Sequence, residues 1–213
     1  MIRLGTGLEN IESLDGLRFT RNKILVEIDL EQNTRSVGEL GLDLGNIYTK
    51  IQDDFIPSDE YLPHKGIVRG LPSGLRSRFD LGWGLDLELG DEIYLHHFVV
   101  DSSNLLKVGG KTYYFFDYVR EFMTYAVPMA YCKSNMEMLG KWTFVKLYEE
   151  KIEVGAFSKV FLHENRGTVC HTFKGSNVNE GDEVFINPDG IYSIIVEGEK
   201  YWAVDESDLL GVL

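Results

Sequence analysis

Cysteine is scarce in this sequence of 213 residues, because only Cys132 and Cys170 occur. Two cysteines are too few for a disulfide framework, and no C-x-x-C spacing is present for a zinc site. We expect both to be buried thiols, since free cysteine behaves as a small apolar side chain. The scarcity argues against a fold held together by disulfides or structural zinc.

Basic residues are outnumbered by acidic ones, and long apolar runs are absent from the sequence. Lys and Arg number 21 against 34 Asp and Glu, which gives a formal net charge of -13. Such a chain repels phosphate backbones and anionic headgroups, so neither nucleic acid nor membrane is expected as a partner. Residues 1–12 carry no apolar stretch typical of a secretion signal, and no run is long enough to span a bilayer. We expect a soluble, cytoplasmic protein.

Combinations of side chains that bind metals or phosphates are missing as well. His96 and His97 are adjacent, so in a strand they point to opposite faces and do not share a metal; a surface or edge pair is expected. The glycine-rich stretches at 70–74 and 82–84 lack the Lys-Ser/Thr pair and the helix of a phosphate-binding loop. No nucleophile with a nearby base is evident. The sequence therefore predicts no metal, no cofactor and no enzyme activity.

Short β-branched or aromatic runs dominate what is present. They are bounded by Gly, Asp or Asn, as strands usually are. With 44% hydrophobic and 12% aromatic residues, the chain has enough apolar surface for a core. The predicted fold class is all-β. The runs are 23–28, 66–69, 92–96, 112–116, 142–147, 167–170, 183–186 and 200–204.

The last four runs repeat the first four in order and in local sequence. Residues 90–95 (GDEIYL) match 181–186 (GDEVFI), and 110–117 (GKTYYFFD) match 198–205 (GEKYWAVD). The opening run and the Gly-x-Val run match at larger spacing, so the first copy has an enlarged loop, which costs little closure entropy. One Gly-Asp turn is common in β proteins, whereas four matches in the same order indicate a duplicated unit.

The duplication predicts four segments along the chain. Residues 1–16 form an N-terminal extension, and 17–128 form the first unit, with one long inserted loop. Pro128 ends that unit, and 129–139 are interpreted as a linker. Residues 140–213 form the second unit.

The second unit resembles the subunit of the GroES-type co-chaperonins. Its ending, Glu206-Ser207-Asp208-Leu209-Leu210, is the most specific likeness, and it follows strand segments similar to those of the family. Upstream, 145–147, a polar loop and the Arg-Gly-Thr-Val segment at 166–169 are similar to the family's opening strand, mobile loop and Arg-Gly-x-Val strand. The likeness covers most of 140–213. The first unit matches only through the duplication.

The resemblance implies two tandem GroES-like small β-barrels. In that family, barrels assemble into a seven-membered dome, and mobile loops dock short apolar segments on the apical domains of a chaperonin. The implied partners are thus further copies of this chain in a homo-oligomeric ring and a GroEL-type chaperonin. A loop that orders on binding gives a weak single contact, and the ring supplies avidity.

By position in the resemblance, the mobile loop of the second unit spans 149–166. Its candidate contact is Val160-Phe161-Leu162, an apolar run in a polar stretch. The loop of the first unit spans 31–65, with Leu40, Leu42 and Leu44, or alternatively 47–48, as candidates. Each run is also what a strand would show: 160–162 as a further barrel strand, and the alternating leucines as a half-buried strand.

Two functions follow as hypotheses. The first is a co-chaperonin-like ring subunit that caps a folding chamber and has no catalytic residues. The alternative is a non-catalytic structural oligomer, for example a phage virion or neck component, built on the same barrel. Medium-chain oxidoreductases also contain a related barrel, but they need a dinucleotide-binding βαβ half with its glycine fingerprint, which this sequence lacks.

Overall fold

A computed structural model describes most of the chain. The described residues are Leu14, Phe19, 21–28, 65–96, Val99, 104–123, 125–154 and 157–213. For 104–105, 152–154 and 157–160 only the backbone is described.

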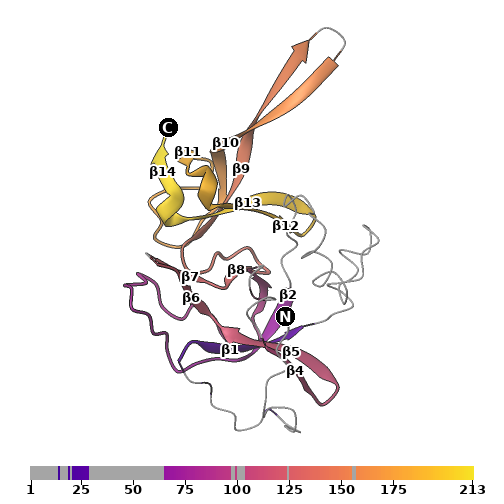
Figure 1. Ribbon diagram of the computed structural model, residues 1–213, viewed down its shortest axis with the longest axis vertical. Helices are drawn as coiled ribbons and strands as arrows, with labels where there is room; N and C mark the ends of the chain where they lie inside the picture. The colour runs from indigo at the N-terminus through magenta and orange to yellow at the C-terminus, as the bar shows by residue number, and fades with distance from the viewer. Residues whose placement is uncertain are drawn as a thin grey trace.

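The described part of the chain is all-β, as predicted. Six strands form a first sheet in the order β4-β5-β1-β2-β3-β8, six form a second sheet in the order β12-β13-β9-β10-β11-β14, and β6 pairs with β7 (Figure 1). The first sheet consists of β1 (Lys23–Ile28), β2 (Lys65–Gly70), β3 (Glu92–Leu95), β4 (Asn104–Val108), β5 (Lys111–Asp117) and β8 (Ala130–Lys133). The remaining elements are β6 (Val119–Glu121), β7 (Ala126–Pro128), β9 (Trp142–Val154), β10 (Phe157–His171), β11 (Glu183–Ile186), β12 (Ile191–Val196), β13 (Glu199–Asp205), β14 (Leu209–Val212) and the 3-10 turns η1 (Pro188–Gly190) and η2 (Glu206–Asp208).

The two sheets have the same strand order. The strands β1, β2, β3, β4, β5 and β8 of the first sheet take the places of β9, β10, β11, β12, β13 and β14 in the second. Their registers agree too: Tyr94 lies opposite Cys132 and Phe185 opposite Gly211, and both pairings shift at the next residue. The matches found in the sequence therefore align equivalent positions of two sheets.

The repeated Gly-Asp pair forms the same turn in both units. Gly90 has φ +95° and Gly181 has φ +92°, in the left-handed region that favours glycine. The Gly90 amide donates to the Val68 carbonyl at 2.9 Å, and the Gly181 amide donates to the Val169 carbonyl at 2.8 Å. Each following aspartate accepts a bond from the main chain three residues earlier. The geometry of this turn thus explains why the Gly-Asp pair recurs in the sequence.

The Gly-x-Val pair marks a close approach between strands. A Cβ atom on Gly66 would lie 2.8 Å from the Glu27 carbonyl oxygen, and one on Gly167 would lie 2.8 Å from the Lys146 carbonyl oxygen. Real Cβ atoms do not come so close to main-chain atoms. Glycine is therefore required at the same place in both sheets.

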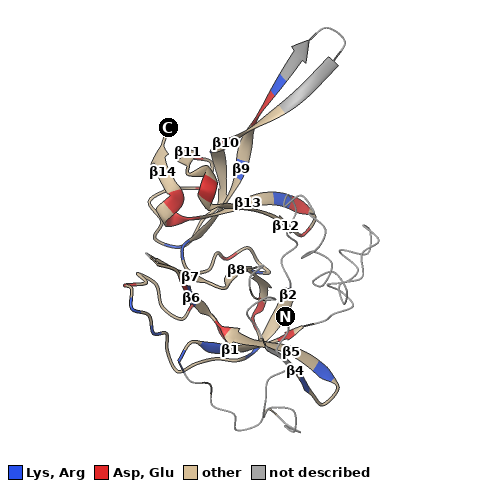
Figure 2. Cartoon of the chain, viewed as in Figure 1, with Lys and Arg blue, Asp and Glu red and all other residues tan. Residues whose placement is uncertain are grey.

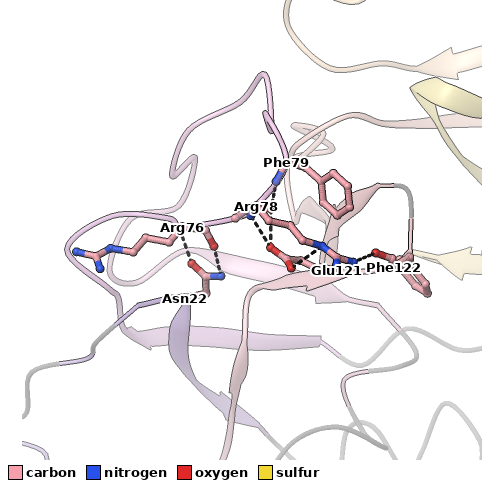
Figure 3. Close-up of polar contacts among 7 residues, drawn as sticks. Asn22, Arg76, Arg78, Phe79, Glu121 and Phe122 are labelled. Atoms are coloured by element: carbon pink, nitrogen blue, oxygen red, sulfur yellow. Dashed lines mark hydrogen bonds and ion pairs between the residues drawn. The ribbon is translucent and has the colours of Figure 1, made fainter.

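The first unit has a large core under an irregular segment, residues 71–91. Leucines and Trp83 from this segment pack on buried residues of the first sheet such as Ile24 and Val68. Polar contacts fasten the segment (Figure 3): Asn22 exchanges two hydrogen bonds with the main chain of Arg76, and the Glu121 carboxylate accepts from the Arg78 amide at 2.8 Å. The second unit has a shorter connection, 172–182, and a smaller core around Val145, Val184 and Val204.

The two units meet in a shared aromatic cluster, here called the junction. Tyr131 and Tyr94 of the first unit pack with Trp142, Phe144 and others of the second. The rings of Tyr131 and Trp142 lie edge to face with centroids 5.1 Å apart. The junction is fully enclosed at its centre, since Tyr131 and Phe144 are both 0% exposed.

Two expectations about the architecture need correction. Each sheet is open among the described residues, because β4 and β8 are edges of the first and β12 and β14 are edges of the second. The closed barrels implied by the resemblance are therefore not formed there. Residues 129–139, expected as a linker, contain β8, an edge strand of the first sheet whose Ala130 and Cys132 are buried. The first unit thus continues at least to Lys133.

No helix among the described residues is both long and apolar enough to cross a membrane.

Candidate functional site

The hairpin of β9 and β10 projects beyond the second sheet (Figure 1). Its inner part is central in that sheet, where β9 also pairs with β13 and β10 with β11. Residues 148–154 and 157–163 pair only with each other. We call these two segments the arm. Because no other described strand pairs with either segment of the arm, its outer main-chain edges are unpaired within the described part of the chain.

A break in pairing separates the arm from the sheet. His163 lies opposite Tyr148, and the next pair is Gly167 opposite Leu147, so 164–166 have no partner on β9. Such a bulge bends and twists a hairpin. Arg166 lies at this point: its Nη2 donates to Glu183 Oε2 at 2.6 Å, and its guanidinium lies 5.0 Å from the centre of the Tyr148 ring.

One face of the arm combines aromatic and charged groups. Directly opposite residues of an antiparallel pair share a face, which places Phe161 with Glu150 and His163 with Tyr148. The rings of Tyr148 and His163 are 5.4 Å apart, and His163 Nε2 lies 2.9 Å from Glu150 Oε2. Tyr148 is 47% exposed and Phe161 is 41% exposed. The other face presents Leu162, which is 45% exposed.

The predicted docking residues therefore lie together on the arm, but in a different conformation from the one expected. Residues 149–166 were expected to form a loop, whereas most of them belong to β9 and β10. The apolar run is a strand, as the alternative interpretation had it, yet Phe161 and Leu162 are not core residues. For Val160 the structure gives only the backbone, opposite Lys151. Leu40, Leu42 and Leu44 of the first unit lie outside the described residues.

A second exposed apolar group was missed from the sequence. Phe185 on β11 is 41% exposed, and at the C-terminal end Leu210 is 68%, Val212 52% and Leu213 57% exposed. A hollow of about 180 Å³ lies beside β14, lined by Ser176, Asn177, Val178, Glu206 and 209–212. The signal in the sequence was the run of leucines at the C-terminal end, which we had interpreted only as part of the resemblance.

The histidine and cysteine expectations are partly wrong. His96 is 1% exposed and stacks on Tyr131 with ring centroids 4.8 Å apart, so it is a junction residue and not a surface one. His97 lies outside the described residues. Cys132 is buried, and desolvation raises the pKa of its thiol to about 12. Cys170 is only half-buried, and burial raises its pKa as well. Neither thiol is activated.

The described residues contain no group of three or more His, Cys, Asp and Glu side chains able to hold a metal ion. Charged residues of both signs are spread over both units (Figure 2). The arm and the C-terminal edge are places where apolar and aromatic side chains are exposed next to one another among the described residues.

No protein-family model matches this sequence, and no curated protein matches it.

Proposed function

We propose that this protein is a cytoplasmic, non-catalytic co-chaperonin-like subunit that assembles into a ring and docks on a chaperonin through its arm. The observation that carries the proposal is the projecting hairpin with adjacent exposed apolar residues, Phe161 and Leu162. The arm occupies the position that the resemblance assigns to the docking loop of a co-chaperonin. The finer architecture, two tandem units of the GroES type, belongs to the same proposal.

The size of the contact favours a multivalent mode of binding. Fully burying a Phe or Leu side chain contributes about 1.5–3 kcal/mol. Phe161 and Leu162 are already more than half covered, so each has only part of that left to gain. A single arm therefore binds weakly, and several arms in one ring raise the overall affinity through effective concentration. Because the arm is already paired, it loses less conformational entropy than a free loop would.

The test uses a charge placed on the arm. Phe161→Asp is expected to abolish ATP-dependent co-sedimentation of the full chain with a GroEL-type chaperonin, because a carboxylate is costly to bury in an apolar contact. Light scattering is expected to show the same oligomer mass as for the unmodified chain. Met123→Asp is the matched control, since Met123 is 92% exposed and lies outside the arm.

Two outcomes would contradict the proposal. If the unmodified chain forms no nucleotide-dependent complex with the chaperonin, the proposed docking function is rejected. If Phe161→Asp unfolds the protein, Phe161 belongs to the core and the arm is wrongly assigned.

The alternative function, a structural oligomer such as a phage virion or neck component, is favoured by one observation. The arm consists of paired strands and not of the loop that the resemblance assigns to chaperonin docking. This function predicts a stable oligomer that ignores chaperonin and ATP. The same co-sedimentation experiment therefore separates the two functions.

A further inference from the structure

The duplicated sheet allows each surface of one unit to be compared with its counterpart in the other. In the junction, Tyr94 and Tyr131 of the first unit cover the outer face of the second sheet, where Phe144, Ile194 and Tyr201 are buried. Tyr94 is 6% exposed and Tyr131 is 0% exposed. An edge of one unit thus packs on a face of the next unit.

The counterpart edge of the second unit is uncovered. By the shared register, Phe185 takes the place of Tyr94 and Leu210 the place of Tyr131. They are 41% and 68% exposed, although their counterparts are buried. We call Phe185 and Leu210, with β14, the tail edge. It presents apolar side chains where the first unit has its contact with a following unit.

The counterpart of the buried outer face lies on the first sheet. Leu25, Leu106 and Tyr113 take the places of Phe144, Ile194 and Tyr201. These three residues form an apolar cluster with Val108, here called the head face. Leu14 and Phe19 pack against it. Leu14, which precedes the first unit, is thus part of the present cover of the head face, whose members are 1–7% exposed.

We propose that copies of this chain associate head to tail, with the tail edge of one copy docking on the head face of the next in place of Leu14. The occupant is a second copy because the chain already contains this contact once, at its junction. The inference deepens the proposed ring by naming its interface, and it does not depend on chaperonin binding. A head-to-tail contact closes into a ring or continues as a filament, according to its rotation.

The polar groups at the junction have counterparts of fitting chemistry at the proposed contact between copies. Across the junction the Tyr94 hydroxyl donates to the Glu197 carboxylate. Their counterparts are Phe185 and Gly109, so the hydroxyl and the carboxylate are absent together and neither would be left without the other. Glu197 and Gly109 both have a positive φ, of +51° and +56°, which supports the equivalence.

A second match concerns the start of each unit. At the junction the Gly140 amide donates to Asp86 Oδ2 at 2.6 Å. Asn177 takes the place of Asp86 and lines the hollow beside β14, and Arg21 takes the place of Gly140 with the same φ of +57°. An Asn side-chain oxygen accepts the same bond. In the proposed contact, the Arg21 amide of the next copy donates to Asn177.

The first experiment measures mass by light scattering over a range of concentrations. Leu210→Asp is expected to reduce the assembly to single chains, because it places a charge in the contact. Leu14→Asp is expected to promote assembly at lower concentration, because it weakens the present cover of the head face. Met123→Asp is the control and leaves the mass unchanged. If the unmodified chain and Leu14→Asp are both single chains at every concentration, the inference is wrong.

The second experiment tests the direction of the contact. Tyr131 packs on Trp142, whose counterpart is Lys23 at the start of β1. Leu210 is therefore expected to lie near Lys23 of the next copy. With a short bis-maleimide, a chain carrying both Leu210→Cys and Lys23→Cys is expected to give a ladder of multimers on a denaturing gel. Leu210→Cys alone and the unmodified chain, which retains Cys132 and Cys170, are expected to give none.

The outcomes separate this inference from the proposed function. A linked dimer from Leu210→Cys alone, with no ladder from the double variant, would indicate a symmetric tail-to-tail contact and overturn the inference. A ladder without any chaperonin binding would support the inference and reject the proposed docking function. If the chain binds the chaperonin, Phe161→Asp abolishes that binding and the double variant gives no ladder, the proposed docking function is supported and the head-to-tail contact is rejected.

Discussion

The two units share one sheet but differ in what covers it. In the first unit, the long segment 71–91 supplies its own cover, with leucines and Trp83 packed on the sheet. In the second, the connection 172–182 is short. Both sheets bury residues on two faces, but one face of the second sheet is covered by Tyr94 and Tyr131 of the first unit. Two sheets with the same strand order therefore differ in how far their stability depends on the other unit. The second unit relies on the junction.

The largest effect is expected at the centre of the junction. Tyr131→Ala removes a ring that is 0% exposed and contacts Trp142, Phe144 and His96. We expect it to lower the free energy of unfolding by about 3–5 kcal/mol, as for other large aromatic truncations. Urea denaturation monitored by tryptophan fluorescence measures this loss.

The counterpart substitution sharpens the comparison. Leu210→Ala alters a residue that is 68% exposed. In dilute solution it is expected to change stability by less than about 0.5 kcal/mol, as surface substitutions usually do. Equal losses at the two positions would show that the tail edge is already covered within the single chain.

The next effect tests whether the two sheets are equivalent inside. Gly66→Ala and Gly167→Ala each place a Cβ against a main-chain carbonyl oxygen, which forces strands apart. We expect losses of about 1–3 kcal/mol at both sites, typical of overpacking, by the same denaturation measurement. Gly84→Ala is the control, because a Cβ there meets nothing within 4 Å. A loss at only one of the two sites would contradict the equivalence.

A further effect depends on pH and concerns Asp86. Its carboxylate accepts bonds from the Tyr118 hydroxyl at 2.8 Å and from the Gly140 amide. Burial raises its pKa above the ordinary value. A raised pKa in the folded state contributes stability that is present below the unfolded pKa of 3.8 and is lost as the pH rises through the folded value. The buried charge is therefore a cost near neutral pH.

Asp86→Asn removes this dependence on pH. We expect the variant to be less stable by about 1–3 kcal/mol, because its amide leaves one buried donor without an acceptor. The difference from the unmodified chain is expected to narrow as the pH rises from about 3.5 to 7, in a series of urea titrations. The exposed counterpart gives the control: Asn177→Asp is expected to show no comparable change. A difference that widens with pH would mean that the charge of Asp86 is favourable.

Local signals in the sequence predicted the strands and their repetition. The Gly-Asp turns and the Gly-x-Val pairs were readable because each depends on main-chain geometry within a few residues. Every one of the eight predicted runs overlaps a strand. The apolar segment 160–162 was also found, since three adjacent apolar residues in a polar stretch stand out in any conformation.

Contacts between units were not predictable in the same way. His96 was expected at the surface, because adjacent histidines give no sign that the ring of Tyr131 will cover one of them. The 129–139 segment was interpreted as a linker, since β8 is only four residues long and gains its stability by pairing with β3. The arm was expected as a loop from its position in the resemblance, whereas its two segments pair with each other. Contacts with residues elsewhere in the sequence determine the burial of His96, the formation of β8 and the pairing of the arm.

The bulge at 164–166 separates the length of the arm from the register of the sheet. Pairing inside the sheet resumes at Gly167 opposite Leu147, whatever the number of pairs beyond the bulge. Two residues could be added to or removed from each strand of the arm without moving a core side chain to the wrong face. Each such step would change the reach of the arm by about 7 Å, from the rise of about 3.3 Å per residue. Insertion and deletion in the arm can thus adjust its reach separately from folding.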